Sequence, residues 1–205
     1  LIALIALANL IVAVTKAMAS GVRLNEVLDT QPSLTDEGSS VQAERKNAVR
    51  VAFEDVGFTY AGSQEPALSH ISFTAKPGET IGIIGGTGCG KSTLVNLIPR
   101  FYDVTSGNVV IDGNNAKEYP FSQLRKKVGM VPQQAVLFKG TIRDNMKWGK
   151  EDATEEEIQR ALSIAQAGDF VNSKPEGLNT MVSQGGSNLS GGQRQRLTIA
   201  RALVG

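Results

Sequence analysis

The chain opens with an almost unbroken run of apolar residues. Asn9 is the only polar residue among the first 14. A helix that crosses a bilayer needs about 20 apolar residues, so this shorter run fits two structures: the end of a membrane helix that begins upstream, or the core helix of a soluble protein. Leu24, Val27 and Leu28 then recur at helical spacing, which predicts that the helix continues as an amphipathic segment to Asp29.

Basic residues follow the apolar run and indicate the orientation of a membrane helix. Lys16 and Arg23 lie just beyond it, and such residues are enriched on the cytoplasmic side of membranes. The stretch 32–48 is polar and rich in small residues, which is typical of a linker. We therefore predict that residues 1–31 end a transmembrane helix and extend it into the cytoplasm, and that 32–48 lead to a globular domain at 49–205.

The pattern from residue 49 onward alternates between short apolar runs and longer segments of helical spacing, which predicts an α/β fold. The expected strands are Val49–Tyr60, Ile71–Ala75, Thr80–Gly85, Gly107–Gly113 and Val128–Val131. The expected helices are Lys91–Ile98, Ser122–Lys127, Thr141–Lys147, Thr154–Ala167 and Leu189–Val204. The first two strands fit an antiparallel pair, whereas Thr80–Gly85 and Val128–Val131 are continuously apolar, as strands buried on both faces are. A polar loop is expected at Asn172–Asn188.

Composition and charge narrow the partners. The 205 residues carry a formal net charge of +1, which gives no reason to expect a nucleic-acid surface. The single cysteine excludes an internal disulfide and fits a reducing compartment.

The residues GGTGCGKST, from Gly85 to Thr93, fit the phosphate-binding pattern G-x-x-x-x-G-K-[ST] at every fixed position, namely Gly85, Gly90, Lys91 and Ser92. A glycine-rich loop can turn successive backbone N–H groups toward one anion, and the helix that follows adds its free N–H groups and the positive end of its dipole. Lys91 supplies a cation for the β- and γ-phosphates, and the Ser92 hydroxyl is placed to bind Mg²⁺. The single cysteine, Cys89, lies inside this loop.

Three further positions are candidates for nucleotide chemistry. Ser190 suits the N-cap of the last helix, and Gly191 and Gly192 leave its first turn open to an anion. Gln133 follows an expected core strand, from which its side chain could reach a metal ion or an attacking water. Tyr60 ends an expected strand and fits either a base-stacking aromatic or a half-buried strand residue.

Taken together, the phosphate loop, the Pro132-Gln133 pair and the LSGGQ segment resemble the ATP-binding cassette (ABC) family. Three sequence segments are similar to those of bacterial multidrug or lipid half-transporters of the exporter class, namely NLIPRFYD, VPQQAVLFKGTIRDN and LSGGQRQRLTIARAL. The resemblance covers nearly all of 49–205. It implies a P-loop NTPase core with a parallel sheet, an antiparallel β subdomain and a helical subdomain, preceded by the end of the last transmembrane helix.

The resemblance also implies residue roles. Tyr60 matches the aromatic that stacks on adenine, and Gln133 matches the glutamine that senses Mg²⁺. The signature segment Ser190–Gln193 matches the one that closes on the γ-phosphate bound by a second cassette. The implied nucleotide-binding positions are Tyr60, Gly85, Thr87, Gly88, Cys89, Gly90, Lys91, Ser92, Thr93, Gln133, Ser190, Gly191, Gly192 and Gln193. Lys91 and Gln133 are the implied catalytic residues, with Ser92 and Gln133 as ligands of Mg²⁺.

The implied protein is an ATP-hydrolysing exporter of a drug, lipid or peptide. It is a multi-pass protein of the cell membrane, with its nucleotide-binding domain in the cytoplasm and a second half-transporter, identical or different, as its partner. The apolar helix is expected to contact lipid, and no nucleic acid is expected.

No apolar run ending in Asp-Glu, which supplies the catalytic carboxylate in the family, occurs in the sequence. We therefore interpret the chain as a piece that stops before this Walker B segment and is inactive by itself. Two alternatives stay open. One is a regulatory half of a heterodimer that binds ATP without hydrolysing it, and the other is a soluble ABC-type ATPase that transports nothing.

Overall fold

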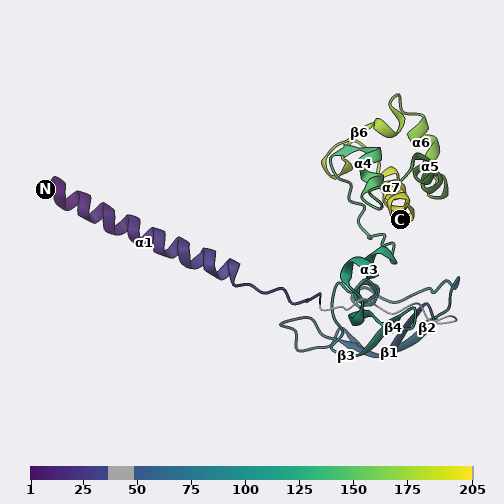
Figure 1. The fold of residues 1–205 in the computed structure, drawn as a ribbon, viewed down its shortest axis with the longest axis horizontal. Coiled ribbons are helices and arrows are strands. Elements are labelled where there is room, and N and C mark those ends of the chain that lie inside the picture. Colours follow the sequence, from purple (N-terminus) through teal and green to yellow (C-terminus); the bar gives the residue numbers. More distant parts are fainter. Residues whose placement is uncertain (37–48, 205) are drawn as a thin grey trace. The chain divides into compact units, whose positions relative to one another are not determined.

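The computed structural model describes residues 1–36 and 49–204, and the chain divides into one unit at Leu1–Asp36 and a second at Glu37–Gly205 (Figure 1). Most of the predicted linker, residues 37–48, lies outside the described residues.

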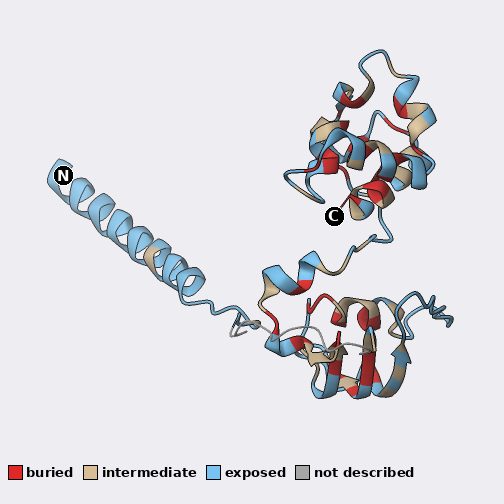
Figure 2. Ribbon diagram, turned by 45° about the vertical axis from the view of Figure 1, so that its right-hand side comes forward, coloured by how far each residue is buried: buried red, intermediate tan, exposed pale blue. Residues whose placement is uncertain are grey.

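The first unit is one long helix, α1, at Ile2–Leu28. None of its residues is buried, and Figure 2 shows the helix in the pale blue of exposed residues except at one intermediate position. Asp29 ends it, with its backbone N–H donating to the Asn25 carbonyl at 2.8 Å. Among the described residues, α1 is the only helix long and apolar enough to cross a membrane, with a mean hydropathy of 2.1 over its most apolar window.

An antiparallel sheet forms the first part of the second unit, in the order β2-β1-β3-β4. Its strands are β1 Val51–Phe58, β2 Leu68–Ala75, β3 Ser106–Ile111 and β4 Asn114–Asn115. Phe53 in the middle of β1 lies opposite Phe73 on one side and Val109 on the other, and the two phenylalanine rings stack with centroids 4.7 Å apart. The predicted antiparallel pairing of the first two strands is confirmed.

Short helices pack on one face of this sheet. They are α2 Lys91–Leu97, the 3₁₀ turn η1 Ala116–Glu118, and α3 Phe121–Lys126. Phe53, Leu97 and Leu124 are 2%, 1% and 0% exposed and belong to one apolar cluster between the sheet and the helices. Each such burial contributes roughly 1.5–3 kcal/mol, so this cluster is what holds α2 against the sheet.

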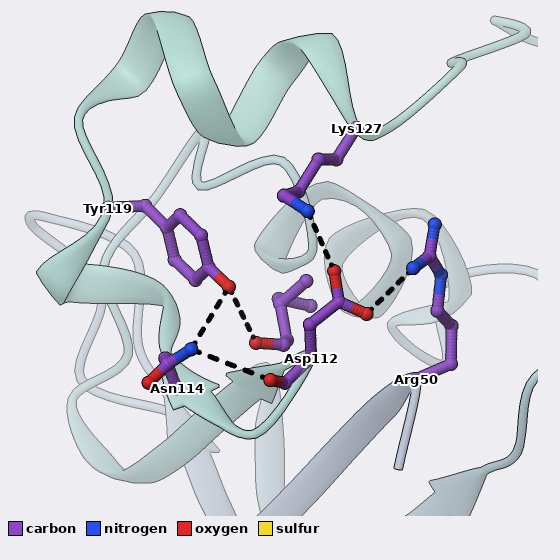
Figure 3. A network of polar contacts seen from close by, with 6 residues as sticks. Arg50, Asp112, Asn114, Tyr119 and Lys127 are labelled. Atoms are coloured by element: carbon purple, nitrogen blue, oxygen red, sulfur yellow. Dashed lines mark hydrogen bonds and ion pairs between the residues drawn. The ribbon is translucent and has the colours of Figure 1, made fainter. Parts of the chain in front are cut away.

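A partly buried polar network fixes the turn between β3 and β4 (Figure 3). Asp112 and Gly113 have φ of 48° and 82°, as a two-residue hairpin turn of type I′ requires. The Asp112 carboxylate accepts from Arg50 at 2.8 Å and from Lys127 at 3.0 Å. The Tyr119 hydroxyl donates to the Ile111 carbonyl at 3.0 Å, so the end of β3 is tied to the segment just before α3.

The predicted parallel sheet is not formed within the described residues, where every strand pair is antiparallel. Neither Thr80–Gly85 nor Val128–Val131 is a strand, and Ile84 is 99% exposed. Apolar, β-branched composition shows only that a segment suits a sheet interior. An isolated strand leaves its backbone N–H and C=O groups unpaired, so it needs a neighbouring strand, and no described segment pairs with either one.

The remaining part of the second unit is mainly helical. It contains β5 Gly140–Thr141, α4 Ile142–Lys147, α5 Glu155–Ile164, α6 Gly168–Asn172, η2 Gly177–Asn179, β6 Met181–Val182, η3 Gln184–Gly186 and α7 Gly191–Leu203. The predicted helix at Thr154–Ala167 is confirmed as α5, and its residues Ile158, Ala161, Leu162 and Ala165 are buried in the apolar cluster at helical spacing.

The segment expected to be a polar loop at Asn172–Asn188 is more structured than predicted. Its strand β6 pairs with β5, and Val182 is 1% exposed. Asn188 stabilises the turn after β6, since its amide donates to the Met181 carbonyl at 2.8 Å and its side-chain oxygen accepts from the Ser183 N–H at 3.0 Å. The two apolar residues of β6 are too short a run to stand out from the polar residues around them.

Candidate nucleotide site

The glycine loop leads directly into α2, as its pattern predicts, and Gly90 is the residue at the junction. Gly90 is the N-cap with φ of 85°, and its carbonyl accepts from the Leu94 N–H at 2.9 Å. A Cβ at Gly90 would lie 2.7 Å from the Ala67 carbonyl oxygen and 2.8 Å from Leu68 Cδ2. Both the backbone conformation and the close approach to β2 therefore require glycine here.

The Lys91 ammonium lies inside the loop. It donates to the carbonyl oxygens of Gly85 at 2.9 Å and Gly86 at 2.5 Å, and lies 3.5 Å from Cys89 Sγ. In the part of the chain that the structure describes, no carboxylate forms an ion pair with Lys91. Its positive charge is therefore available to an anion that replaces the neutral carbonyl groups.

The residues around Lys91 leave the loop open to solvent. Thr87, Gly88, Cys89 and Ser92 are exposed, whereas Thr93 is buried. The Ser92 hydroxyl thus lies at the surface at the start of α2, as a ligand for a phosphate-bound metal ion would.

Tyr60 lies beside the start of α2. Its hydroxyl shares a hydrogen bond of 2.8 Å with Thr93 Oγ1. The ring meets Phe58 and Tyr102 edge to face, with centroids 4.7 Å and 5.3 Å away, and remains 38% exposed. The structure therefore brings the predicted aromatic residue next to the predicted phosphate loop.

Tyr102 is a member of this aromatic group that the sequence analysis does not single out. It is 39% exposed and follows the end of α2 by five residues. The signal was the Phe101-Tyr102 pair just after the phosphate-loop helix, but only the pairing of β1 with β3 explains why Tyr102 meets Tyr60.

The second candidate anion site, at the start of α7, has the predicted N-cap. Ser190 Oγ accepts from the Gln193 N–H at 3.2 Å, and Gln193 Oε1 accepts from the Ser190 N–H at 3.0 Å. Gly191 and Gly192 are exposed, and a Cβ at either would find no atom closer than 3.9 Å. The first turn of this 13-residue helix is thus accessible to a ligand.

The basic residues of α7 have structural partners. Arg194 donates to the Leu189 carbonyl at 2.6 Å and to the Gly186 carbonyl at 3.4 Å, which fastens the turn before the helix. The guanidinium of Arg196 lies 5.7 Å from the centre of the Phe170 ring. These contacts give both guanidinium groups a structural role within the helical part.

Gln133 lies beside α7. Gln133 and Gln134 are exposed and line a groove together with Gly191 and Arg194. Within residues 1–36 and 49–204, no hydrogen bond joins Gln133 to the phosphate loop. The joint metal site of Ser92 and Gln133 therefore stays a prediction.

The described residues contain no group of three or more His, Cys, Asp and Glu side chains that could hold a metal ion. A hydroxyl and an amide oxygen are hard donors that suit Mg²⁺, which in nucleotide sites takes few protein ligands and binds substrate phosphates as well. The donor set of Ser92 and Gln133 fits that ion by its chemistry.

Comparison with known proteins gives one consistent family. The family model described as "ABC transporter" matches residues 68–205. The chain is 46% identical over 195 residues to the uncharacterized ABC transporter ATP-binding protein YfiB of Bacillus subtilis, covering 95% of this chain and 34% of that protein. It is 42% identical over 193 residues to the ATP-dependent lipid A-core flippase of Desulfotalea psychrophila, covering 93% and 33%.

A further relative is the beta-(1→2)glucan export ATP-binding/permease protein NdvA of Rhodopseudomonas palustris, 46% identical over 178 residues, covering 87% of this chain and 29% of the relative. Among solved structures, a bacterial Atm1-family ABC exporter with ATP bound matches with a TM-score of 0.83 and 33% identity, covering 93% of this chain and 33% of the other. The chain spans about a third of the length of these proteins.

Proposed function

Because the chain belongs to the ABC transporter family, we propose that it binds ATP through residues 85–93 and is the ATP-binding part of a membrane exporter. The observation that carries this proposal is the Lys91 ammonium, which lies without a carboxylate partner among the described residues inside a glycine loop at a helix start. Tyr60, held at the same helix start by Thr93, would stack on the adenine ring.

Phosphoryl transfer by such a site depends on positioning and charge stabilisation. Lys91 would exchange its carbonyl partners for the β- and γ-phosphate oxygens. Ser92 and Gln133 would hold Mg²⁺, which supplies positive charge to the phosphates when it is bound. Gln133 would also orient the attacking water, which requires its loop to approach α2.

We propose that a second half-transporter, identical or different, completes the site. The first turn of α7 is exposed, and the phosphate loop of this chain precedes a different helix, α2. This arrangement supports the use of α7 by a nucleotide that another molecule binds. Ser190, Gly191, Gly192 and Gln193 of one subunit would then close on the γ-phosphate held by the partner.

The exposed apolar surface of α1 supports a place in the membrane, with Lys16 and Arg23 toward the cytoplasm. In this proposal the longer protein is multi-pass, its nucleotide-binding domain is cytoplasmic, and α1 contacts lipid. One relative is named a lipid A-core flippase and another a glucan export protein, and a lipid, drug or peptide is the proposed class of cargo here.

The experiment that tests ATP binding compares two lysine variants of the chain in detergent. Lys91→Ala removes charge-assisted hydrogen bonds to phosphate, each worth about 1.5–3 kcal/mol, so we expect the affinity for a fluorescent ATP analogue to fall at least ~10-fold. Lys76→Ala, which removes a cation from an exposed position after β2, is the matched control and should bind like the unaltered chain. Equal affinities for both variants would rule out the phosphate loop as the site.

An alternative that the sequence leaves open is a regulatory half that binds ATP without hydrolysing it. Both functions predict ATP binding that depends on Lys91. Steady-state ATP turnover by the membrane-embedded transporter containing this chain separates them, since only a hydrolysing half loses turnover in Lys91→Ala.

A further inference from the structure

The segment that follows Gln133 is fastened to the helical part of the second unit at three consecutive carbonyl groups. The Val136 carbonyl accepts from Arg201 Nη2 at 3.1 Å, the Leu137 carbonyl from the Gly185 N–H at 3.1 Å, and the Phe138 carbonyl from Asn145 Nδ2 at 2.9 Å. We call residues 136–138 the strap. Because all three carbonyls are bonded, the strap cannot slide without breaking several hydrogen bonds at once.

Asn145, on α4, holds one end of the strap. It is only 1% exposed, and its side-chain oxygen also accepts from the Phe138 N–H at 2.9 Å. Its amide donates a second time, to the Thr141 carbonyl at 3.0 Å. A buried side chain with its donors and acceptor all engaged has a single favourable orientation, so Phe138 is held at a defined distance from α4.

Arg201, on α7, holds the other end. Besides its bond to Val136, its guanidinium lies 5.7 Å from the centre of the Phe138 ring, which in turn stacks on Trp148 with centroids 4.6 Å apart. Between the two ends, Leu137 is 1% exposed and packs in the apolar cluster that includes Leu189, the residue just before Ser190.

The strap thereby connects two of the candidate site residues. Gln133, three residues before it, shares a groove with Gly191 and Arg194 of α7. The turn before the signature segment is bonded to the strap through Gly185, and a Cβ at Gly186 would lie 3.2 Å from Leu137 Cδ1. The same few contacts therefore locate both Gln133 and the start of α7.

We propose that Asn145 and Arg201 are positioning residues that fix Gln133 relative to the signature segment, so that the two move as one body. The consequence of this inference rests on the proposed function. When α7 closes on the nucleotide bound by the partner, it would carry Gln133, which serves the nucleotide bound by its own subunit. Neither residue touches the nucleotide in this scheme, and both act through the strap.

The geometric test uses spin labels and needs no nucleotide. Gln134→Cys and Gln195→Cys, in a Cys89→Ser background, place labels on the two sides of the groove. We expect a narrow distribution of label-to-label distances in the chain, and a broadened one in Asn145→Asp, which keeps the side-chain volume and loses both donated hydrogen bonds. Arg201→Met removes the hydrogen bond at the other end of the strap and should also broaden the distribution. Arg201→Lys, which can still donate to the Val136 carbonyl, should keep the distribution narrow.

The matched control is Thr198→Val. Thr198 is as buried as Asn145, at 1% exposed, and its hydroxyl donates within α7 to the Arg194 carbonyl at 2.9 Å, with no bond to the strap. Its variant should keep the narrow distribution. Distances that stay narrow in both Asn145→Asp and Arg201→Met, or that broaden equally in Thr198→Val, would overturn the positioning role.

The kinetic test uses the membrane-embedded transporter that contains this chain. Asn145→Asp should lower kcat for ATP roughly 10-fold while KM stays within about 2-fold, because misplacing Gln133 affects the reaction and leaves Lys91 in place. A raised KM with unchanged kcat would contradict the proposal. If the distances broaden as expected and the chain binds no ATP, the strap is supported and the proposed function is what fails.

Discussion

At the scale of single residues, a comparison of two glycines of the phosphate loop distinguishes the cost of backbone strain from the cost of a close contact. Gly88 and Gly90 have nearly the same φ, 83° and 85°, but a Cβ at Gly88 would meet nothing within 4 Å. We expect Gly88→Ala to lower the free energy of unfolding by about 1–2 kcal/mol, the cost of a left-handed non-glycine residue. Gly90→Ala should cost more, because its Cβ also collides with the backbone at Ala67.

Chemical denaturation without nucleotide measures this difference, since bound ATP would mask it. The two variants serve as each other's control, because they differ only in the space around the new methyl group. Equal losses of stability would mean that the loop does not pack on β2 in solution.

At the scale of elements, helix α5 begins with a capping box whose glutamate also binds a lysine. The pKa of Glu157 lies below its ordinary value, first because Lys150 donates to its side chain and then because the Thr154 backbone does. The folded state therefore releases this proton more readily than the unfolded state. The stabilisation is present above the unfolded pKa of about 4.3 and is lost as the pH falls through the lower folded value.

Thermal melts between about pH 6 and pH 3 test this contribution. The Glu157→Gln variant keeps a capping side chain and removes the titrating group, so its melting temperature should fall less steeply on acidification. If the melting temperatures of the two proteins fall equally with pH, the start of α5 contributes no stability that depends on protonation.

At the scale of the whole molecule, the proposed membrane-spanning role of α1 can be tested by placing a charge in it. Leu7→Lys places a charge in its apolar half and should weaken insertion by up to about 3 kcal/mol. Ser20→Lys adds the same charge to the mixed half, beyond Lys16, and should have little effect. We expect alkaline carbonate to release Leu7→Lys from membranes more readily than Ser20→Lys or the unaltered chain.

Release of the unaltered chain by carbonate would contradict a spanning α1 and would favour the soluble alternative. Equal retention of both lysine variants would indicate that the membrane association does not depend on the apolar half of the helix.

Interactions between neighbours in the chain account for the features that were correctly predicted. The predicted N-cap at Ser190 involves residues only three positions apart, so it depends on local sequence alone. The same holds for the junction of the glycine loop with α2. In each case, the chain geometry brings the partners together whatever the rest of the molecule does.

Features that depend on distant partners were predicted less well. The apolar pattern at Thr80–Gly85 and Val128–Val131 predicted two buried strands, but neither segment forms a strand or pairs with another among the described residues. The meeting of Tyr60 with Tyr102, and of the strap with Asn145 and Arg201, has no signature in residue spacing. Asn145 in particular is an ordinary polar residue in a short helix until its burial is known.

By itself, then, the order of residues determined the phosphate loop, the signature helix start, the apolar N-terminal helix and the family to which they belong. These depend on contacts within a few positions and on local backbone preferences. The tertiary structure alone decided that Lys91 has no carboxylate partner in the described region, that Tyr60 leans on α2, and that Gln133 lies along α7. Those outcomes depend on which segments far apart in the sequence pack together, and that packing is set by the free energy of the complete fold.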